Sequence, residues 1–183
     1  IRKIGILLVP DFALMSYASA VEPFRAANCL SGRDLYEWRH ISTDGEPVRA
    51  SNGVQIVPEN AVGDIVDFDL LIVCAGGNPA EFQHNATLAW LRRVALSGTR
   101  IAGVSGGPLI IARAGLLEDY RCTIHWEHIP IFVEEFPRHD LRRSLFENDR
   151  DRLTCSGGTA ALDMMHYLIE EDHGHELASD VVE

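Results

Sequence analysis

Three glycine-rich turns, each placed directly after a buried apolar run, constrain the fold of this chain more than any other feature. The runs span residues 69–75, 101–104 and 153–156, and the turns are Gly76-Gly77, Ser105-Gly106-Gly107 and Ser156-Gly157-Gly158. A short continuous apolar run is typical of a strand that is buried on both faces. Glycine after such a strand lets the backbone turn sharply into a helix. The pattern therefore predicts a parallel sheet whose strands alternate with helices.

The rest of the chain continues this alternation. Residues 3–9 (KIGILLV) are another buried apolar run, and residues 38–43 are a further candidate strand. Asn52-Gly53 favours a tight turn, so a hairpin is expected within residues 48–57. Apolar residues at three- and four-residue intervals predict two helices, one around Tyr17, Val21, Phe24 and Ala27 and one around Leu88, Leu91, Val94 and Ala95. A third helix is expected over 109–114, between Pro108 at its start and Gly115 at its end. A fourth is expected over 159–172, with Leu162, Met165 and Ile169 on one face.

The expected fold class is α/β, a three-layer sandwich with a mostly parallel, doubly wound sheet. The chain has 183 residues, with neither an internal repeat nor a linker-like segment, so residues 1–183 are expected to form one domain. No apolar run approaches the roughly 18 residues that a membrane span needs.

Charge and cysteine content narrow the class of protein. The chain has 16 Lys and Arg residues and 27 Asp and Glu residues, so its net charge is −11. This charge argues against binding of nucleic-acid phosphates by this segment. The basic cluster of Arg138, Arg142, Arg143, Arg150 and Arg152 is interrupted by acidic residues and is expected to be a solvated or dimer-facing surface. Four cysteines without a CxxC pair suit a reducing cytoplasm.

Metal and cofactor binding are not expected from the sequence. The pairs His125-x-x-His128 and His173-x-His175 have spacings that a metal site uses, but neither comes with a clear set of further ligands. Trp90 and Trp126 are expected to be packing residues, with an aromatic cage for a quaternary ammonium ligand as the alternative.

Residues 103–107 (GVSGG) match the G-x-S-x-G pattern of a nucleophile elbow between a strand and a helix. In a catalytic interpretation Ser105 is the nucleophile and His125 its base, with Glu22, His84 and Asp163 as possible neighbours. The backbone amides of Gly76, Gly77 and Gly106 would then form an oxyanion hole. The simpler interpretation is that these glycines only permit tight turns.

Several longer segments together resemble a known family. They are similar to the N-terminal domain of AraC-family transcriptional regulators. The segments are KIGILLVPDF, EPFRAAN, DLLIVCAGG, GVSGGPLIIARAGLLEDYRCTIHW and LTCSGGTAALDMMHYLIEEDHGHELA. The resemblance implies a flavodoxin-like fold of the class I glutamine amidotransferase type, shared with PfpI-type proteases. It also implies that the helix-turn-helix DNA-binding domain of such a regulator lies C-terminal to this segment and is absent from this chain.

Enzymes of the resembled superfamily carry a cysteine nucleophile at the elbow, an acidic residue from the first helix and a nearby histidine. Ser105 stands at the cysteine position, Glu22 at the acidic position, and His125 matches the histidine loosely. A serine hydroxyl, unlike a thiol, stays unreactive without a strong base. We therefore expect a non-enzymatic domain, with a serine hydrolase or amidase using Ser105 and His125 as the alternative.

The resemblance implies an effector-sensing and dimerisation domain of a bacterial regulator. The expected ligand site comprises Glu22, Gly76, Gly77, Ser105, Gly106, His125 and Trp126. Relatives of this type respond to arginine or to betaine- and carnitine-like amines, so the expected effector is a small zwitterion. The expected partners are this small molecule and a second copy of the chain, with DNA contacted only through the absent domain and no membrane involved. A third possibility is a vestigial pocket in a domain that only dimerises.

Overall fold

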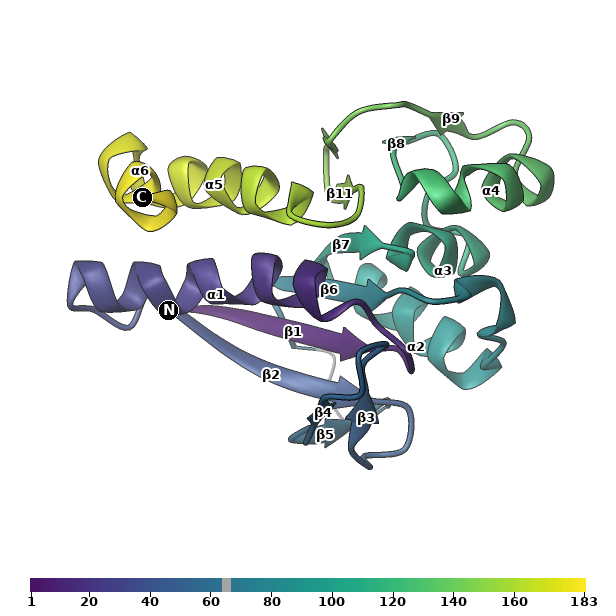
Figure 1. Ribbon diagram of the computed structural model, residues 1–183, viewed down its shortest axis with the longest axis horizontal. Helices are drawn as coiled ribbons and strands as arrows, with labels where there is room; N and C mark the ends of the chain where they lie inside the picture. The colour runs from purple at the N-terminus through teal and green to yellow at the C-terminus, as the bar shows by residue number, and fades with distance from the viewer. Residues whose placement is uncertain (64–66) are drawn as a thin grey trace.

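The fold is a central parallel sheet covered on both faces by helices, as seen in a computed structural model that describes residues 1–63 and 67–183 (Figure 1). The strands of the sheet are β1 (Arg2–Leu8), β2 (Tyr36–Ser42), β5 (Asn60–Ala61), β6 (Leu70–Ala75), β7 (Arg100–Ser105), β10 (Phe146–Asp149) and β11 (Arg152–Cys155). Their order across the sheet is β10-β11-β7-β6-β1-β2-β5. All neighbouring pairs are parallel except β10 with β11. The predicted mostly parallel, doubly wound sheet is confirmed.

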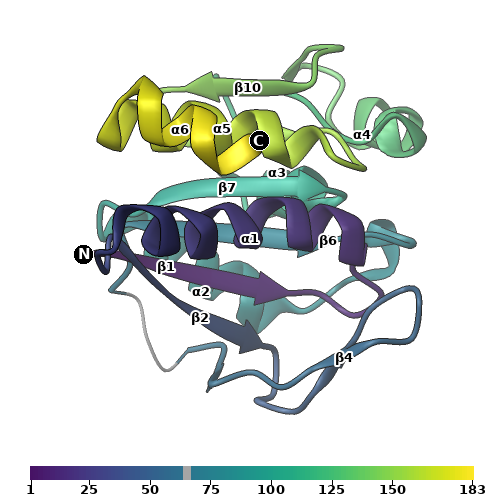
Figure 2. The same cartoon turned by 60° about the vertical axis from the view of Figure 1, so that its left-hand side comes forward.

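The helices divide between the two faces of the sheet, as Figure 2 shows. The helices are α1 (Leu14–Ser31), α2 (Asn85–Leu96), α3 (Gly107–Arg113), α4 (Ile129–Glu135), α5 (Ala160–His173) and α6 (His175–Val182), with short 3-10 turns η1 (Pro79–Glu81) and η2 (Trp126–His128). α1, α5 and α6 cover one face, and α2 and α3 cover the other. This arrangement is the predicted three-layer sandwich.

Alternation along β1 explains why both faces of the sheet are covered. Ile4, Ile6 and Leu8 are buried in the same apolar cluster as Phe24 of α1. Leu7 belongs to the opposite cluster, with residues of α2 and α3. Successive side chains of a strand point to opposite faces, so a strand that is apolar throughout needs cover on both.

Two small ladders lie outside the main sheet. β3 (Val48–Arg49) pairs antiparallel with β4 (Gln55–Ile56), and Gly53 at their turn has φ +93°, which confirms the predicted hairpin. β8 (Arg121–Cys122) pairs with β9 (Asp140–Leu141). β5, β8, β9, β10, α4 and α6 have no counterpart among the sequence predictions. Segments this short contain too few residues to reveal a period.

Some side chains lie differently from their predicted positions. Leu162 was expected on the buried face of the last long helix, but it is 36% exposed, whereas the neighbouring Met164 and Met165 are buried. Trp90 is buried and packs in the core as expected, whereas Trp126 is 71% exposed and is not a core residue. Within the described residues, no helix is both long and apolar enough to cross a membrane.

Candidate functional site

Ser105 forms a sharp elbow where β7 ends and α3 begins. Its φ of +58° lies in the left-handed region, and the residue is only 4% exposed. Such a conformation costs a non-glycine residue on the order of 1 kcal/mol or more. Gly107 makes the turn possible, because a Cβ there would lie 2.2 Å from the carbonyl oxygen of Val73. The G-x-S-x-G pattern therefore has a steric basis in the close approach of α3 to β6.

Two histidines lie beside this elbow. The His125 backbone N–H donates to the Ser105 carbonyl oxygen at 3.1 Å. The ring of His125 packs on Gly157, where a Cβ would lie only 1.7 Å from His125 Cδ2. His128 is buried, with 8% of its surface exposed. Its Cδ2 atom lies 3.5 Å from the position that a Cβ of Gly106 would occupy, and its ring centroid lies 5.5 Å from that of His125. The turns after β7 and β11 and the segment around η2 therefore meet at one place.

The environment of His128 favours its neutral form. Burial lowers the pKa of His128 below its ordinary value, and the neighbouring His125 lowers it further. The Nδ1 atom of His125 accepts a hydrogen bond from the Glu127 backbone N–H at 3.2 Å, so a neutral His125 carries its proton on Nε2. One ligand atom each from His125, Glu127 and His128 lie within 4.8 Å of one another, which is close enough to hold a metal ion.

The geometry gives Ser105 little help as a nucleophile. Among the hydrogen bonds of the described residues, none joins the Ser105 hydroxyl to a histidine ring; His125 meets Ser105 through its backbone. The Gly106 backbone N–H donates to the Ala75 carbonyl oxygen at 3.2 Å, so it already has an acceptor and is not free for an oxyanion. His84 caps α2, its Nδ1 atom accepting from the Thr87 backbone N–H, which gives this histidine a structural role.

Glu22 does not join the elbow in the way the resemblance implies. Its carboxylate is 57% exposed and pairs with Arg25 Nε at 2.7 Å on the outer side of α1. Ser16, in the first turn of α1, is instead buried, and its hydroxyl donates to the Gly158 carbonyl oxygen at 3.3 Å. An isolated serine within an apolar stripe has no sequence signal for such a contact. Gly76 and Gly77 lie against Ala13 and Asp11, just before α1.

A buried thiol lies next to the elbow but is not activated. The Ser105 backbone makes a hydrogen bond to Cys155, yet burial dominates and raises the pKa of Cys155 to about 12. Burial likewise raises the pKa of Cys74 on the neighbouring strand β6. Both thiols therefore stay protonated at neutral pH, which removes the reactivity of a thiolate.

An open hollow is lined in part by the sequence neighbours of the two histidines. It has a volume of about 390 Å³ and is lined by Thr123, Ile124, Trp126, Ile129, Arg143, Ser144, Leu145 and Ser156. We refer to it as the Trp126 hollow. The Trp126 ring stacks on the His125 ring at 5.6 Å and 29°. The hollow combines an apolar wall, an exposed indole face, hydroxyls and one guanidinium, and it is within the size range of small-molecule sites.

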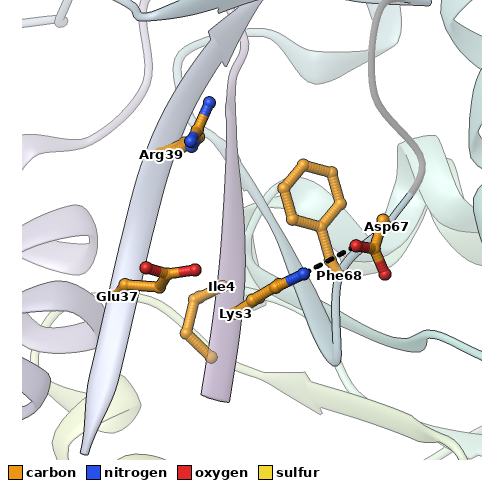
Figure 3. Close-up of a pocket in the computed structure, with 6 residues that line it drawn as sticks. All are labelled: Lys3, Ile4, Glu37, Arg39, Asp67 and Phe68. Carbon is orange, nitrogen blue, oxygen red and sulfur yellow. Dashed lines mark hydrogen bonds and ion pairs between the residues drawn. The ribbon is translucent and has the colours of Figure 1, made fainter. Parts of the chain in front are cut away.

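Other hollows lie away from the elbow. One of about 200 Å³ lies near the amino ends of β1 and β2, where Lys3 Nζ pairs with Asp67 Oδ2 at 2.7 Å (Figure 3). Its charges balance, because Lys3 and Arg39 stand with Glu37 and Asp67. A larger one, of about 840 Å³, lies between the ends of α3 and α4. Ligands of open parallel sheets bind beyond the carboxyl ends of the strands, which favours the Trp126 hollow.

Comparison with known proteins identifies the family of this chain. The model of the DJ-1/PfpI family matches residues 2–171. The chain belongs to the DJ-1/PfpI family. A crystal structure of an AraC family transcriptional regulator from Pseudomonas putida, 27% identical, superposes with a TM-score of 0.90 and covers 100% of this chain and 98% of its own. The flavodoxin-like fold expected from the resemblance is thereby confirmed.

Curated members of the DJ-1/PfpI family include transcription regulators. The HTH-type transcriptional regulator GbdR of Pseudomonas aeruginosa is 44% identical over 182 residues, covering 100% of this chain and 50% of its own length. The HTH-type transcriptional regulator GlxA of Rhizobium meliloti is 43% identical, covering 99% of this chain and 56% of its own. This chain thus spans about half the length of these relatives, and the resemblance to the N-terminal domain of AraC-type regulators is confirmed.

The DJ-1/PfpI family also contains enzymes. Isonitrile hydratase of Pseudomonas putida is 28% identical over 186 residues and covers 96% of this chain and 74% of its own length. The family therefore holds both regulators and enzymes on one fold.

Proposed function

We propose that this chain is the effector-sensing domain of a cytoplasmic AraC-type transcriptional regulator, and that it binds a small amino-acid-like or quaternary-amine ligand without chemical turnover. The observation that supports this proposal most is the Trp126 hollow. The similarity to regulators such as GbdR, at 44% identity, adds to it.

The residues of the hollow match the two charges of a zwitterion. The exposed face of Trp126 attracts a quaternary ammonium group through its ring quadrupole, an interaction worth about 0.5–2 kcal/mol. The Arg143 guanidinium suits a carboxylate, which it can bind through two parallel hydrogen bonds. His125 supports the hollow through the stack of its ring on Trp126. Glu22, on the outer side of α1, contributes no direct contact in this proposal.

Calorimetric titration of the chain with arginine, glycine betaine and carnitine tests the proposal. One of these ligands is expected to bind, and Trp126→Ala and Arg143→Gln should each weaken binding on the order of tenfold. Arg142→Gln is the matched control, because Arg142 lies next in sequence but pairs with Asp140 at 2.6 Å. Binding that is absent, or that is unchanged in both variants, would contradict the proposal.

A serine hydrolase has less geometric support, because no hydrogen bond among the described residues joins the Ser105 hydroxyl to a histidine ring, and the Gly106 backbone N–H already donates to Ala75. A fluorophosphonate probe distinguishes the two functions. The proposal expects no labelling of the folded chain. Labelling that disappears in Ser105→Ala would instead establish the hydrolase.

Pairing into a homodimer and DNA contact through a separate domain complete the proposal. Symmetric dimers are the commonest oligomers, and a net charge of −11 leaves DNA contact to another part of a regulator. Analytical ultracentrifugation should give twice the chain mass of 20.3 kDa, and a monomer at all concentrations tested would overturn the dimer.

A further inference from the structure

The corner between the last two helices brings together three side chains that the sensing site does not use. α5 ends at His173 and α6 begins at His175, so Gly174 alone joins them, with φ +91° and ψ 169°. α6 packs against α1 and α5 through the buried Ala178 and the half-buried Leu177. Figure 1 shows this corner near the amino end of β1, opposite the elbow. The short connection turns the chain back on itself, so that the start of α6 faces the side of α5.

His166 and Glu170 stand on one side of α5, because residues four apart in a helix lie one turn above the other. The turn at Gly174 adds His175 from the next helix. The His175 Nδ1 atom lies 3.2 Å from Glu170 Oε1, and the rings of His166 and His175 are 6.3 Å apart between centroids. One ligand atom from each of the three residues lies within 4.8 Å of the other two.

We propose that His166, Glu170 and His175 form a binding site for a divalent transition-metal ion, with Zn²⁺ as the preferred probe, and that the bound metal fastens α6 to α5. Two imidazoles and one carboxylate are a donor set that zinc uses when its fourth position is left open. Ligand atoms around tetrahedral zinc stand about 3.4 Å apart, given metal–ligand bonds near 2.1 Å. Small side-chain rotations suffice to reach this spacing from the present positions.

A second contact orients the His175 ring for this role. The Ser179 hydroxyl lies 3.3 Å from His175 Nε2, one turn further along α6. Metal-binding histidines commonly donate their second ring N–H to a neighbouring oxygen, which fixes the tautomer and frees the other nitrogen for the metal. In the metal-free chain the Nδ1–H of His175 donates to the Glu170 carboxylate. On metal binding the ring would take the other tautomer, in which Nε2–H donates to Ser179 and the Nδ1 lone pair faces the metal.

The histidine pair visible in the sequence, His173-x-His175, is not the pair that the fold brings together. The His173 ring makes an edge contact with the Tyr36 ring at 5.4 Å between centroids and 86° between planes. His173 therefore lies outside the cluster, only two residues from a ligand. This makes His173→Gln a matched control for His175→Gln.

Titration of the chelator-treated chain with zinc chloride tests the proposal by calorimetry. A His128→Gln background removes the other cluster, formed by His125, Glu127 and His128. In this background one zinc ion per chain is expected, and His166→Gln or His175→Gln should weaken binding about tenfold or more, because each removes one of three ligands. His173→Gln should leave the affinity unchanged.

Hydrogen exchange of the α6 amides gives an independent readout. Zinc should slow exchange across α6 in the parent chain and in His173→Gln, but not in His175→Gln. Two results would overturn the proposal: absence of zinc binding in the His128→Gln background, or an affinity that His166→Gln and His175→Gln leave unchanged. Circular dichroism confirms that each variant is folded, which is expected because the His175 side chain is 75% exposed.

Discussion

The two ends of the central sheet are built from different chemistry. At the amino ends of the strands, charged side chains form pairs: Arg2 with Asp172, Lys3 with Asp67, and Arg100 with Glu171. At the carboxyl ends, glycine turns bring main chain against main chain, and the elbow residue Ser105 has a φ of +58°. Side-chain pairs therefore close one end, whereas close-packed backbone and two histidines form the other.

This difference shows where the fold gains stability and where it stores strain. Asp172 is the clearest case at the amino end, because its side chain is only 4% exposed, pairs with Arg2 and accepts a hydrogen bond from the Tyr36 hydroxyl at 3.0 Å. Strained backbone persists only where its surroundings hold it in place. The elbow is held by the approach of α3 to β6, which tolerates no added atom at Gly107.

The largest expected effect is at the elbow. Gly107→Ala would place a Cβ 2.2 Å from the Val73 carbonyl oxygen, which belongs to a central strand and cannot move aside. Overpacking of this kind costs about 3 kcal/mol, and occasionally more, in the free energy of unfolding. Gly98→Ala is the control, because its φ is +92° but nothing lies within 4 Å. Equal losses in urea unfolding would contradict the prediction, because they would show that the contact with Val73 adds nothing beyond the backbone strain present at Gly98.

The next effect tests the amino end. Asp172→Asn weakens the pair with Arg2 and the hydrogen bond from Tyr36, so we expect a loss of about 2 kcal/mol, less than for a fully buried pair because Arg2 is 41% exposed. Asp67→Asn is the comparison, since its carboxylate is 82% exposed and its loss should not be measurable. Similar unfolding midpoints for the two variants would refute the distinction.

A smaller gain is expected from relieving the elbow. Glycine adopts a φ of +58° without strain, so Ser105→Gly should be about 1 kcal/mol more stable than Ser105→Ala. Alanine is the appropriate reference because it removes the same hydroxyl and retains the Cβ. Thermal unfolding of both variants measures the difference, and a less stable glycine variant would show that the elbow is not strained.

The smallest expected effect is on the pH dependence of the free energy of unfolding. Burial lowers the pKa of His128 below its ordinary value of 6.5, so the unfolded chain takes up a proton there first as the pH falls. The stability from neutral His128 is present above about pH 6.5 and is lost as the pH drops towards the lower folded pKa. His128→Gln should therefore flatten the pH dependence of stability between pH 7 and roughly pH 5.

His139 provides a check on this assignment, because burial lowers its pKa too. His139→Gln should remove a separate part of the slope, so the double variant should be flatter than either single one. An unchanged slope in His128→Gln would place the titrating group elsewhere.

Regular elements were predictable from the sequence because their signal is local. The run KIGILLV is apolar at nearly every position, which requires cover on both faces, and β1 does lie between two apolar clusters. Asn52-Gly53 predicted its turn for the same reason: the conformation depends on the residues of the turn itself. By contrast, the exposure of Leu162 depends on where α5 sits relative to other elements, and periodicity does not report this.

The features of the candidate site likewise divide into those that depend on local sequence and those that depend on packing between distant elements. The sequence alone determined the family resemblance, the strand–turn–helix at Ser105 and the glycines that such a turn requires, since each depends on neighbouring residues and on backbone sterics. Only the tertiary structure decided that Glu22 faces outward, that Cys155 lies against Ser105, and that His175 meets His166 rather than His173. Those meetings depend on packing between elements distant in sequence, where a rotation of one helix changes every partner on its face.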